Sequence, residues 1–186
     1  MSSRELAVAF VCTGNRFRSP IAEALFVRDT EGLPVRTESL GTLELGPRPA
    51  VPEAVALAEG MGVDLSGHRA RSLADADLGG VDLVLGFERR HVLASVVDAH
   101  AHIEQTFTLP DFVALLETLP GPPLPNDRIE RALIRIRQAH AARPAGFRNA
   151  PMEELRDPLG LTAAAQRQTA LELQRLVDRL SELLLA

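Results

Sequence analysis

A continuous apolar run near the N-terminus, residues 5–12, is the feature that most restricts the fold of this chain. Its length and its lack of polar alternation are typical of a strand buried on both faces of a parallel sheet. A polar turn follows, and Ser19-Pro20 then introduces good helix formers from Ile21 to Arg28. Serine is a frequent N-cap and proline is favoured at the first helical position, so we expect a helix to begin here. A buried strand that leads through a turn into a helix predicts an α/β fold.

The rest of the chain repeats this alternation of strand and helix. We expect further strands at Val35–Leu40, Val81–Leu85 and near Ile103–Phe107, and helices at Val51–Met61 and Glu88–Asp98. Helical spacing of apolar residues returns after residue 128 and again in the C-terminal segment. Because βαβ units are right-handed, the pattern predicts a three-layer, doubly wound α/β fold in which helices flank a four-stranded parallel sheet.

The length of 186 residues predicts a single domain over residues 1–186. The stretch 120–125 is rich in proline, and we expect residues 119–151 to form an irregular insertion in that domain. The longest apolar stretches fall far short of the ~18 residues that a membrane helix needs, so no membrane insertion is expected. The first residues lack a secretory signal and one cysteine cannot form an internal disulfide, so we expect a cytoplasmic protein.

The charge of the chain argues against nucleic-acid binding. The formal net charge is −5, which provides no general basic field for a phosphate backbone. All 20 basic residues of the Lys and Arg types are arginines, so the chain contains no lysine. A chain without lysine cannot contain the G-x4-G-K-[ST] loop of nucleotide hydrolases, so ATP or GTP binding of that kind is excluded.

The polar turn after the first strand has the properties of an anion site. Successive backbone N–H groups and the positive end of the following helix dipole point into one concavity there. Gly14 permits a backbone conformation that other residues resist, and Asn15 is tolerated at positive φ. Arg18 can close the site with a planar fork that matches two phosphate oxygens. The expected phosphate-binding residues are Thr13, Gly14, Asn15, Arg16, Phe17, Arg18 and Ser19.

Cys12, the single cysteine, stands at the start of this loop. A helix N-terminus beside an arginine favours the thiolate, and Ser19 could donate its hydroxyl to the sulfur. Attack of the thiolate on phosphorus would form a phosphocysteine intermediate. The alternative is a buried structural cysteine, since free cysteine is among the most buried residue types. The complete C-x5-R-S-P pattern at a strand-to-helix junction favours a nucleophile over that alternative.

Residues Val11–Pro20 resemble the signature loop V-C-x-G-N-x-C-R-S-P of the low-molecular-weight protein tyrosine phosphatase family. The resemblance continues through Ser19–Phe26, Glu38–Thr42, Gly62–Ser72 and Asp157-Pro158, in the order of the family. It implies a parallel four-stranded sheet flanked by helices, in agreement with the fold predicted above. It also implies a phosphatase that acts on a phosphorylated protein or a small phosphomonoester, without a cofactor.

The family takes its general acid from an Asp-Pro step on a late loop, and Asp157-Pro158 is the one Asp-Pro in this chain. The resemblance therefore implies that Asp157 joins Cys12 and Arg18 as a catalytic residue, although Asp-Pro is more often a simple turn. It also implies that Asn15, Ser19, Ser39 and His68 hydrogen-bond among themselves to support the loop. For His68 a surface turn is an equal alternative.

The remaining four histidines, among them His100 and His102, are expected to be solvated. A metal site is not expected, because no cysteine or carboxylate spacing supports one.

Three departures from the family pattern affect these expectations. Phe17 replaces the second cysteine of the loop, so no protective disulfide can form and peroxide should inactivate the protein. Leu159-Gly160 replace the aromatic residues that usually follow the Asp-Pro, which weakens the preference for phosphotyrosine, although Phe17 or Leu45 could supply an apolar wall. The insertion at 119–151 has no obvious counterpart.

The identity of the substrate is the point left open by these departures. Relatives that act on phosphoarginine carry a small residue where this chain has Arg16, so phosphoarginine ranks below phosphotyrosine. Thiol-dependent arsenate reduction is an alternative reaction on the same fold and loop, but the relay cysteines are missing. A non-catalytic phosphate-binding regulatory module is the second alternative, and the retained nucleophile and acid argue against it.

Overall fold

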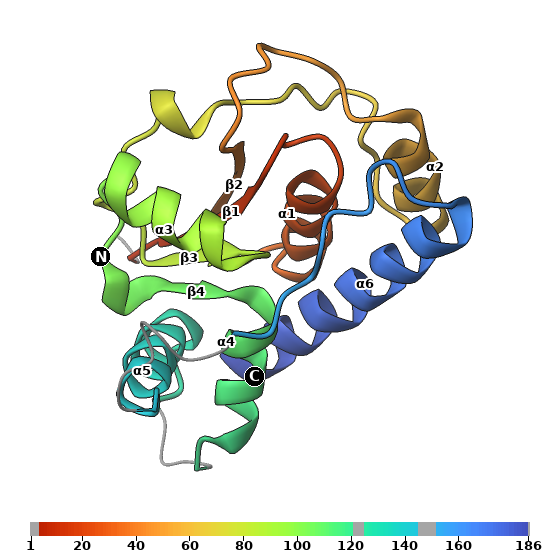
Figure 1. Ribbon diagram of the computed structural model, residues 1–186. Coiled ribbons are helices and arrows are strands. Elements are labelled where there is room, and N and C mark those ends of the chain that lie inside the picture. Colours follow the sequence, from red (N-terminus) through yellow and green to blue (C-terminus); the bar gives the residue numbers. More distant parts are fainter. Residues whose placement is uncertain (1–3, 121–124, 145–151, 186) are drawn as a thin grey trace.

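A four-stranded parallel sheet forms the centre of the protein, as the computed structural model shows for residues 4–120, 125–144 and 152–185 (Figure 1). Its strands are β1 (Leu6–Cys12), β2 (Val35–Gly41), β3 (Leu83–Gly86) and β4 (Thr106–Thr108), in the spatial order β2-β1-β3-β4. The predicted fold class is confirmed. The chain leaves β1 toward β2 on one side and returns to β3 on the other. The carboxyl ends of β1 and β3 therefore border the crevice in which such sheets bind ligands.

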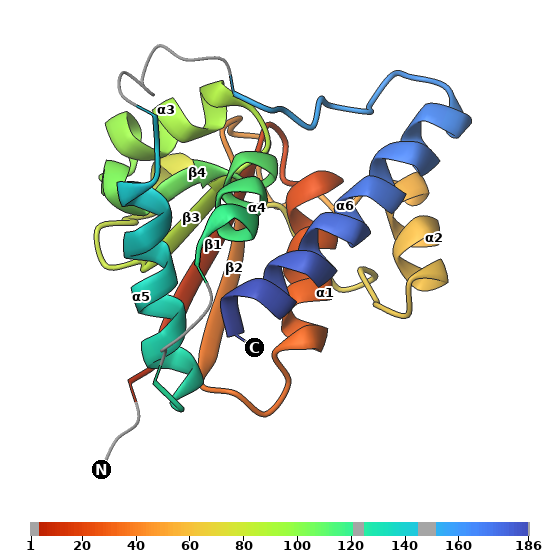
Figure 2. The same cartoon turned by 90° about the horizontal axis from the view of Figure 1, so that it is seen from below.

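Helices cover both faces of this sheet (Figures 1 and 2). On the larger face lie α1 (Arg18–Asp29), α2 (Pro52–Gly60) and α6 (Ala163–Leu185). The other face is covered by α3 (Arg89–Asp98) and the 3-10 turn Leu73–Asp75. Beside β4 lie the 3-10 turn Ile103–Gln105, α4 (Leu109–Thr118) and α5 (Arg128–Ala141). Within the described residues, no helix is both long enough and apolar enough to cross a membrane.

The side chains of β1 show why its sequence is apolar without interruption. Leu6, Val8 and Phe10 point into the larger core between the sheet and α1 and α6. Ala7 and Ala9 point into the smaller core toward α3. Because successive side chains in a strand point to opposite faces, a strand covered on both faces needs apolar residues at every position. The buried strand predicted from the sequence is confirmed.

Several predicted boundaries are shifted by one or two residues, as at β3, which begins at Leu83 and not at Val81. Two further differences concern α1 and β4. Helix α1 begins at Arg18 with Phe17 at the N-cap, so Ser19 lies inside the first turn and makes no capping bond. The fourth strand begins at Thr106, and Ile103–Gln105 forms a 3-10 turn instead. Both errors arise at junctions where side-chain contacts with distant residues decide the backbone conformation.

The expected irregular insertion at 119–151 contains a regular helix. Helix α5 spans Arg128–Ala141 and packs against α6, α4 and β1. Its buried residues Ile129, Ala132 and Ile136 follow the helical spacing noted in the sequence. Residues 121–124 and 145–151 lie outside the described residues, and the single-domain assignment stays a prediction.

Candidate active site

Cys12 is the last residue of β1, and its side chain is held in the concavity that follows. The thiol is buried, and its Sγ lies 3.0 Å from Oγ of Ser19. The backbone N–H of Asn15 donates to the same sulfur over 3.2 Å. Asn15 has φ of 50°, a left-handed backbone conformation that asparagine tolerates better than most residues. The sulfur therefore accepts from one backbone N–H and has one hydroxyl within hydrogen-bond distance.

The side chain of Asn15 joins three segments of the chain. Its Nδ2 donates to Oγ of Ser19 and to Oγ of Ser39, each over 2.8 Å. Its Oδ1 accepts a bond from the backbone N–H of Arg71, and its carbonyl oxygen lies 2.7 Å from Nε2 of His68. The structure therefore brings Asn15, Ser19, Ser39 and His68 together. Burial outweighs the bond to Asn15 and lowers the pKa of His68.

Glycine has a different role in this loop from the one predicted. Gly14 is not among the glycines with positive φ, and a Cβ there would lie 3.3 Å from Cδ1 of Leu45. The tighter position is Gly41, the last residue of β2, where a Cβ would lie 2.9 Å from the backbone N of Asn15. The loop passes directly over the end of β2 because Gly41 has no side chain.

Arg18 extends from the first turn of α1 to the same site and is fully buried. Its Nη1 donates to Oε1 of Glu88 over 2.5 Å and to the carbonyl of Leu155 over 2.8 Å. Its Nη2 donates to Oγ1 of Thr13 over 3.2 Å and lies 2.8 Å from Oδ2 of Asp157. Two carboxylates thus balance the charge of one buried guanidinium, as a buried cation requires.

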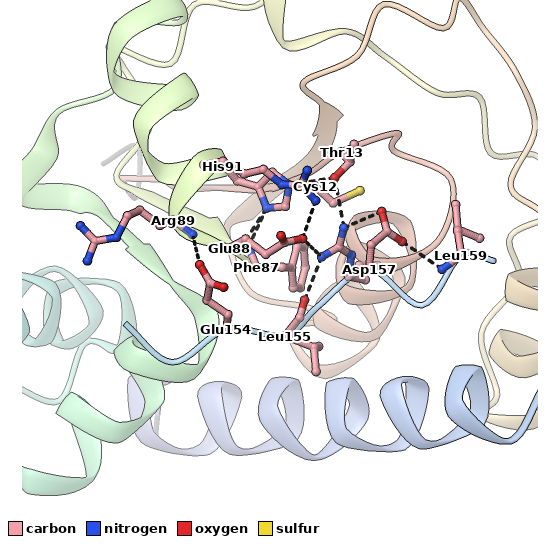
Figure 3. A network of polar contacts seen from close by, with 12 residues as sticks. Cys12, Thr13, Phe87, Glu88, Arg89, His91, Glu154, Leu155, Asp157 and Leu159 are labelled. Atoms are coloured by element: carbon pink, nitrogen blue, oxygen red, sulfur yellow. Dashed lines mark hydrogen bonds and ion pairs between the residues drawn. The ribbon is translucent and has the colours of Figure 1, made fainter. Parts of the chain in front are cut away.

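Asp157 reaches this site from a segment that crosses the carboxyl edge of the sheet (Figure 3). The backbone N–H of Leu155 donates to the carbonyl of Phe87, and Oγ1 of Thr108 donates to the carbonyl of Glu153. These bonds fix the segment to the ends of β3 and β4. The carboxylate of Asp157 remains partly exposed, with 28% of its side-chain surface accessible, so it faces the open side of the site.

Glu88 and His91 belong to the site and were missed by the sequence interpretation. His91 is fully buried, so the expectation that it would be solvated is wrong. Its Nδ1 accepts bonds from the backbone N–H groups of Phe87 and Glu88, and its Nε2 lies 3.1 Å from Oγ1 of Thr13. A carboxylate three residues before a histidine at a strand-to-helix junction resembles a capping box, and that pattern could have indicated the pair.

Burial and charge determine the protonation of these two groups. Burial, followed by the charge of Arg18, lowers the pKa of His91 from 6.5 to about 3. Burial alone would raise the pKa of Glu88, but bonds from Arg18 and Arg90 hold it below its usual value. Near neutral pH the site therefore contains a neutral imidazole and an ionised Glu88.

The residues expected to line the substrate entrance divide into buried and exposed groups. Phe17 is buried in the larger core, so it cannot supply the apolar wall suggested for it. Arg16 is only partly buried and its Nε donates to the carbonyl of Pro49. Leu45 lies against the loop at Gly14, and Leu159 is 40% exposed next to the acid.

Across the described residues, no group of three or more His, Cys, Asp or Glu side chains could hold a metal ion.

Comparison with known proteins identifies one family. Residues 7–120 match the family described as "Low molecular weight phosphotyrosine protein phosphatase". A protein-arginine-phosphatase from Bacillus subtilis is 33% identical over 108 residues, or 57% of this chain and 71% of that protein. The low molecular weight protein-tyrosine-phosphatase Etp from Escherichia coli K12 is 37% identical over 86 residues, which span 46% of this chain and 57% of Etp.

The structural similarity extends further than the sequence matches. The low molecular weight protein tyrosine phosphatase from T. tengcongensis superposes with a TM-score of 0.69 at 30% identity, covering 96% of this chain and 99% of that one. The segment that contains Asp157 lies beyond the region matched by the family model. The choice of Asp157 as the candidate acid therefore rests on its contact with Arg18 and on the resemblance around Asp157-Pro158.

Proposed function

Because the chain belongs to the low-molecular-weight phosphotyrosine protein phosphatase family, we propose that it hydrolyses phosphomonoesters through a phosphocysteine intermediate on Cys12. The thiolate Sγ attacks phosphorus while the bond between phosphorus and the leaving oxygen breaks. Asp157, in its protonated form, gives its proton to that oxygen. Arg18 and the backbone N–H groups of the loop stabilise the charge on the phosphoryl oxygens.

The second step returns the enzyme to its starting state. A water molecule attacks the phosphorus of the phosphocysteine, and the carboxylate of Asp157 accepts a proton from it. The P–S bond breaks and the electron pair returns to Sγ. Ser19, whose Oγ lies 3.0 Å from the sulfur, donates a hydrogen bond to the thiolate that leaves. Inorganic phosphate is the product.

The environment of Arg18 is the observation that carries this proposal. One buried guanidinium contacts the loop of the nucleophile at Thr13 and the candidate acid at Asp157. Asp157 comes from a segment far away in the sequence, so the contact is not a consequence of local structure. A module that only binds phosphate has no need for a nucleophile and a second carboxylate in the same site.

For the substrate, we propose phosphotyrosine or another aryl phosphate ahead of phosphoarginine. The named relatives include both protein-tyrosine and protein-arginine phosphatases. The guanidinium of Arg16 extends from the loop and is held by Pro49, so a cation stands near the entrance. It would repel an arginine leaving group but not a neutral phenol. Leu45 and Leu159 provide the apolar surface that an aromatic ring can contact.

The experiment is turnover of p-nitrophenyl phosphate by the wild type and two variants. We expect Cys12→Ser to abolish turnover. We expect Asp157→Ala to slow it while a phosphorylated enzyme can still be trapped by rapid acid quench and detected by mass. A panel of phosphotyrosine peptide, phosphoarginine peptide and arsenate with an external thiol then ranks the substrates. A wild type that binds inorganic phosphate but hydrolyses none of these compounds would favour a binding module.

A further inference from the structure

The hydroxyl of Thr13 is held on two sides in the candidate active site. Its Oγ1 lies 3.1 Å from Nε2 of His91 and 3.2 Å from Nη2 of Arg18. Figure 3 shows this oxygen within the network that connects the loop to the start of α3. A threonine hydroxyl has one proton to donate and two lone pairs that accept. Which atom donates and which accepts in each of these two contacts therefore decides where the proton of Thr13 can point.

The roles are fixed by the backbone around His91. Nδ1 of the ring accepts from the N–H of Glu88 over 3.1 Å and from the N–H of Phe87 over 3.3 Å. A ring nitrogen that accepts holds no proton, so the proton of the neutral imidazole lies on Nε2. Burial and the charge of Arg18, which lower the pKa of His91 to about 3, keep the ring neutral. Nε2 therefore donates to Thr13.

Arg18 is the second donor, because a guanidinium has N–H groups and no acceptor. Both lone pairs of the Thr13 oxygen are then occupied, and its own proton must point elsewhere. Within the described parts of the chain, no acceptor contacts this hydroxyl. The same Nη2 of Arg18 also contacts Asp157, so the hydroxyl lies beside the edge of the guanidinium that faces the candidate acid.

We propose that His91 is a positioning residue that directs the hydroxyl proton of Thr13 to an oxygen of the bound phosphoryl group. The inference rests on the proposed function for the nature of the ligand. A donor whose direction is already fixed adds to the stabilisation of phosphoryl charge without reorganisation in the reaction. Thr13 thus contributes its side chain, and not only its backbone, to phosphate binding.

The first test removes the hydroxyl and leaves the shape. Thr13→Val is expected to raise the dissociation constant for inorganic phosphate about tenfold, or about 1.4 kcal/mol, measured by titration calorimetry. Thr13→Ser, which keeps the hydroxyl, should recover most of that loss. As a matched control, Thr118→Val removes an exposed hydroxyl that bonds only within α4, and it should leave phosphate affinity unchanged.

The second test separates the two nitrogens of His91. Asparagine places an acceptor near the position of Nδ1 and nothing at Nε2, whereas glutamine places its amide nitrogen near Nε2. We expect phosphate affinity to fall about threefold more in His91→Asn than in His91→Gln. In a double-mutant cycle, His91→Asn should have almost no further effect once Thr13→Val is present, because the two residues act through one hydroxyl.

Other outcomes would overturn the proposal. If the losses of phosphate affinity in Thr13→Val and His91→Asn were additive in the double variant, His91 would merely stabilise α3. The same conclusion would follow if the loss of phosphate affinity in each variant only tracked the fall in its melting temperature. Unchanged phosphate affinity in Thr13→Val would contradict the inference even if both His91 variants failed to fold. Because the measurement is phosphate binding, it remains valid if the wild type proves inert toward phosphate esters, a result that would count against the proposed function alone.

Discussion

Arg18 connects the loop to the distant parts of the site, since its guanidinium lies within hydrogen-bond distance of Glu88, Asp157, Thr13 and Leu155. A buried arginine keeps its charge and must be neutralised where it lies. Glu88 does this from the buried side. Asp157 approaches from the partly exposed side, where it competes with any phosphate that the arginine is to bind.

This competition leads to a prediction for Asp157→Asn. Removing the charge of Asp157 should strengthen the binding of inorganic phosphate, because one anion fewer contacts Arg18. Turnover of p-nitrophenyl phosphate should fall by about 10²-fold or more, because the proposed general acid is lost. Calorimetry and steady-state kinetics measure the two effects. Glu154→Gln is the matched control, since Glu154 lies on the same segment but bonds to the backbone of Arg89. Weaker phosphate binding in Asp157→Asn would contradict the prediction.

The buried neutral His91 makes stability depend on pH. Its pKa is 6.5 in a model peptide and about 3 in the folded protein. Below pH 6.5 the unfolded chain binds a proton that the folded protein does not, so folding stability falls as the pH falls. His91 takes nothing from the free energy of unfolding above pH 6.5. Proton binding by the unfolded chain lowers that free energy by about 2 kcal/mol by about pH 5.

Urea denaturation of the wild type and His91→Asn between about pH 7.5 and 5 measures this loss. We expect the pH dependence to be shallower in the variant by about 2 kcal/mol over that range. The control is His100→Asn, at a histidine whose side chain is 79% exposed and whose positive φ asparagine tolerates, and it should change the slope less than His91→Asn. Equal slopes in the wild type and His91→Asn would show that another group is responsible.

At the scale of elements, the loop proposed to bind phosphate depends on the strand beside it. The loop follows β1, yet its conformation is supported by β2 through Ser39 and Gly41. Ser39 holds the amide of Asn15, and Gly41 leaves space for the backbone of the loop. The two strands pair in parallel from Leu6 with Val35 to Cys12 with Gly41, so the register itself places Gly41 under the loop.

We therefore predict that Gly41→Ala displaces the loop. The added Cβ would lie 2.9 Å from backbone atoms of Gly14 and Asn15. Backbone atoms cannot move away as the end of a flexible side chain could. We expect kcat/KM to fall about tenfold to hundredfold, with about 1–3 kcal/mol of destabilisation. Gly67→Ala, where a new Cβ meets no atom within 4 Å, should be close to wild type. Full activity in Gly41→Ala would show that the loop conformation tolerates the shift.

At the scale of the whole molecule, the site lies at one edge of the sheet and the largest core lies behind it. The C-terminal helix α6 packs against α1 and α4 (Figure 2). Its Leu173 and Leu180 are fully buried. The side chains proposed for the chemistry lie at one edge of this core, apart from the contacts between α6, α1 and α4. The segment from residue 152 connects them, because it crosses the site before it enters α6.

This separation predicts that a core substitution lowers stability without changing catalysis. Leu180→Ala should reduce the free energy of unfolding by about 2–5 kcal/mol, because it leaves a cavity in a closely packed core. Its kcat/KM, measured well below the melting temperature, should equal that of the wild type. Leu171→Ala, at a side chain that is 51% exposed, should cost less than about 0.5 kcal/mol. A parallel loss of activity in Leu180→Ala would show that α6 controls the site.

The sequence by itself determined the unit from β1 through the loop to α1. Its apolar run, its turn residues and its helix formers are local signals, and Cys12 and Arg18 lie within this one unit. The order of the four strands along the chain, and of α2, α3 and α6, followed from the same kind of periodicity, whereas α4 was not predicted. Asp157 was found because a short resemblance carried its position, not because any local pattern placed it beside Arg18.

Only the tertiary structure decided which distant groups surround that unit. Pairing of β3 with β1 brings Glu88 and His91 to the loop, and hydrogen bonds to β3 and β4 bring the segment with Asp157 across it. The same packing buries Phe17, which the sequence interpretation had suggested as an apolar wall for the substrate, and His91, which it had expected to be solvated. Periodicity reports which face of an element is apolar, but the partners of a buried charge depend on strand order and register, which link residues far apart in the chain.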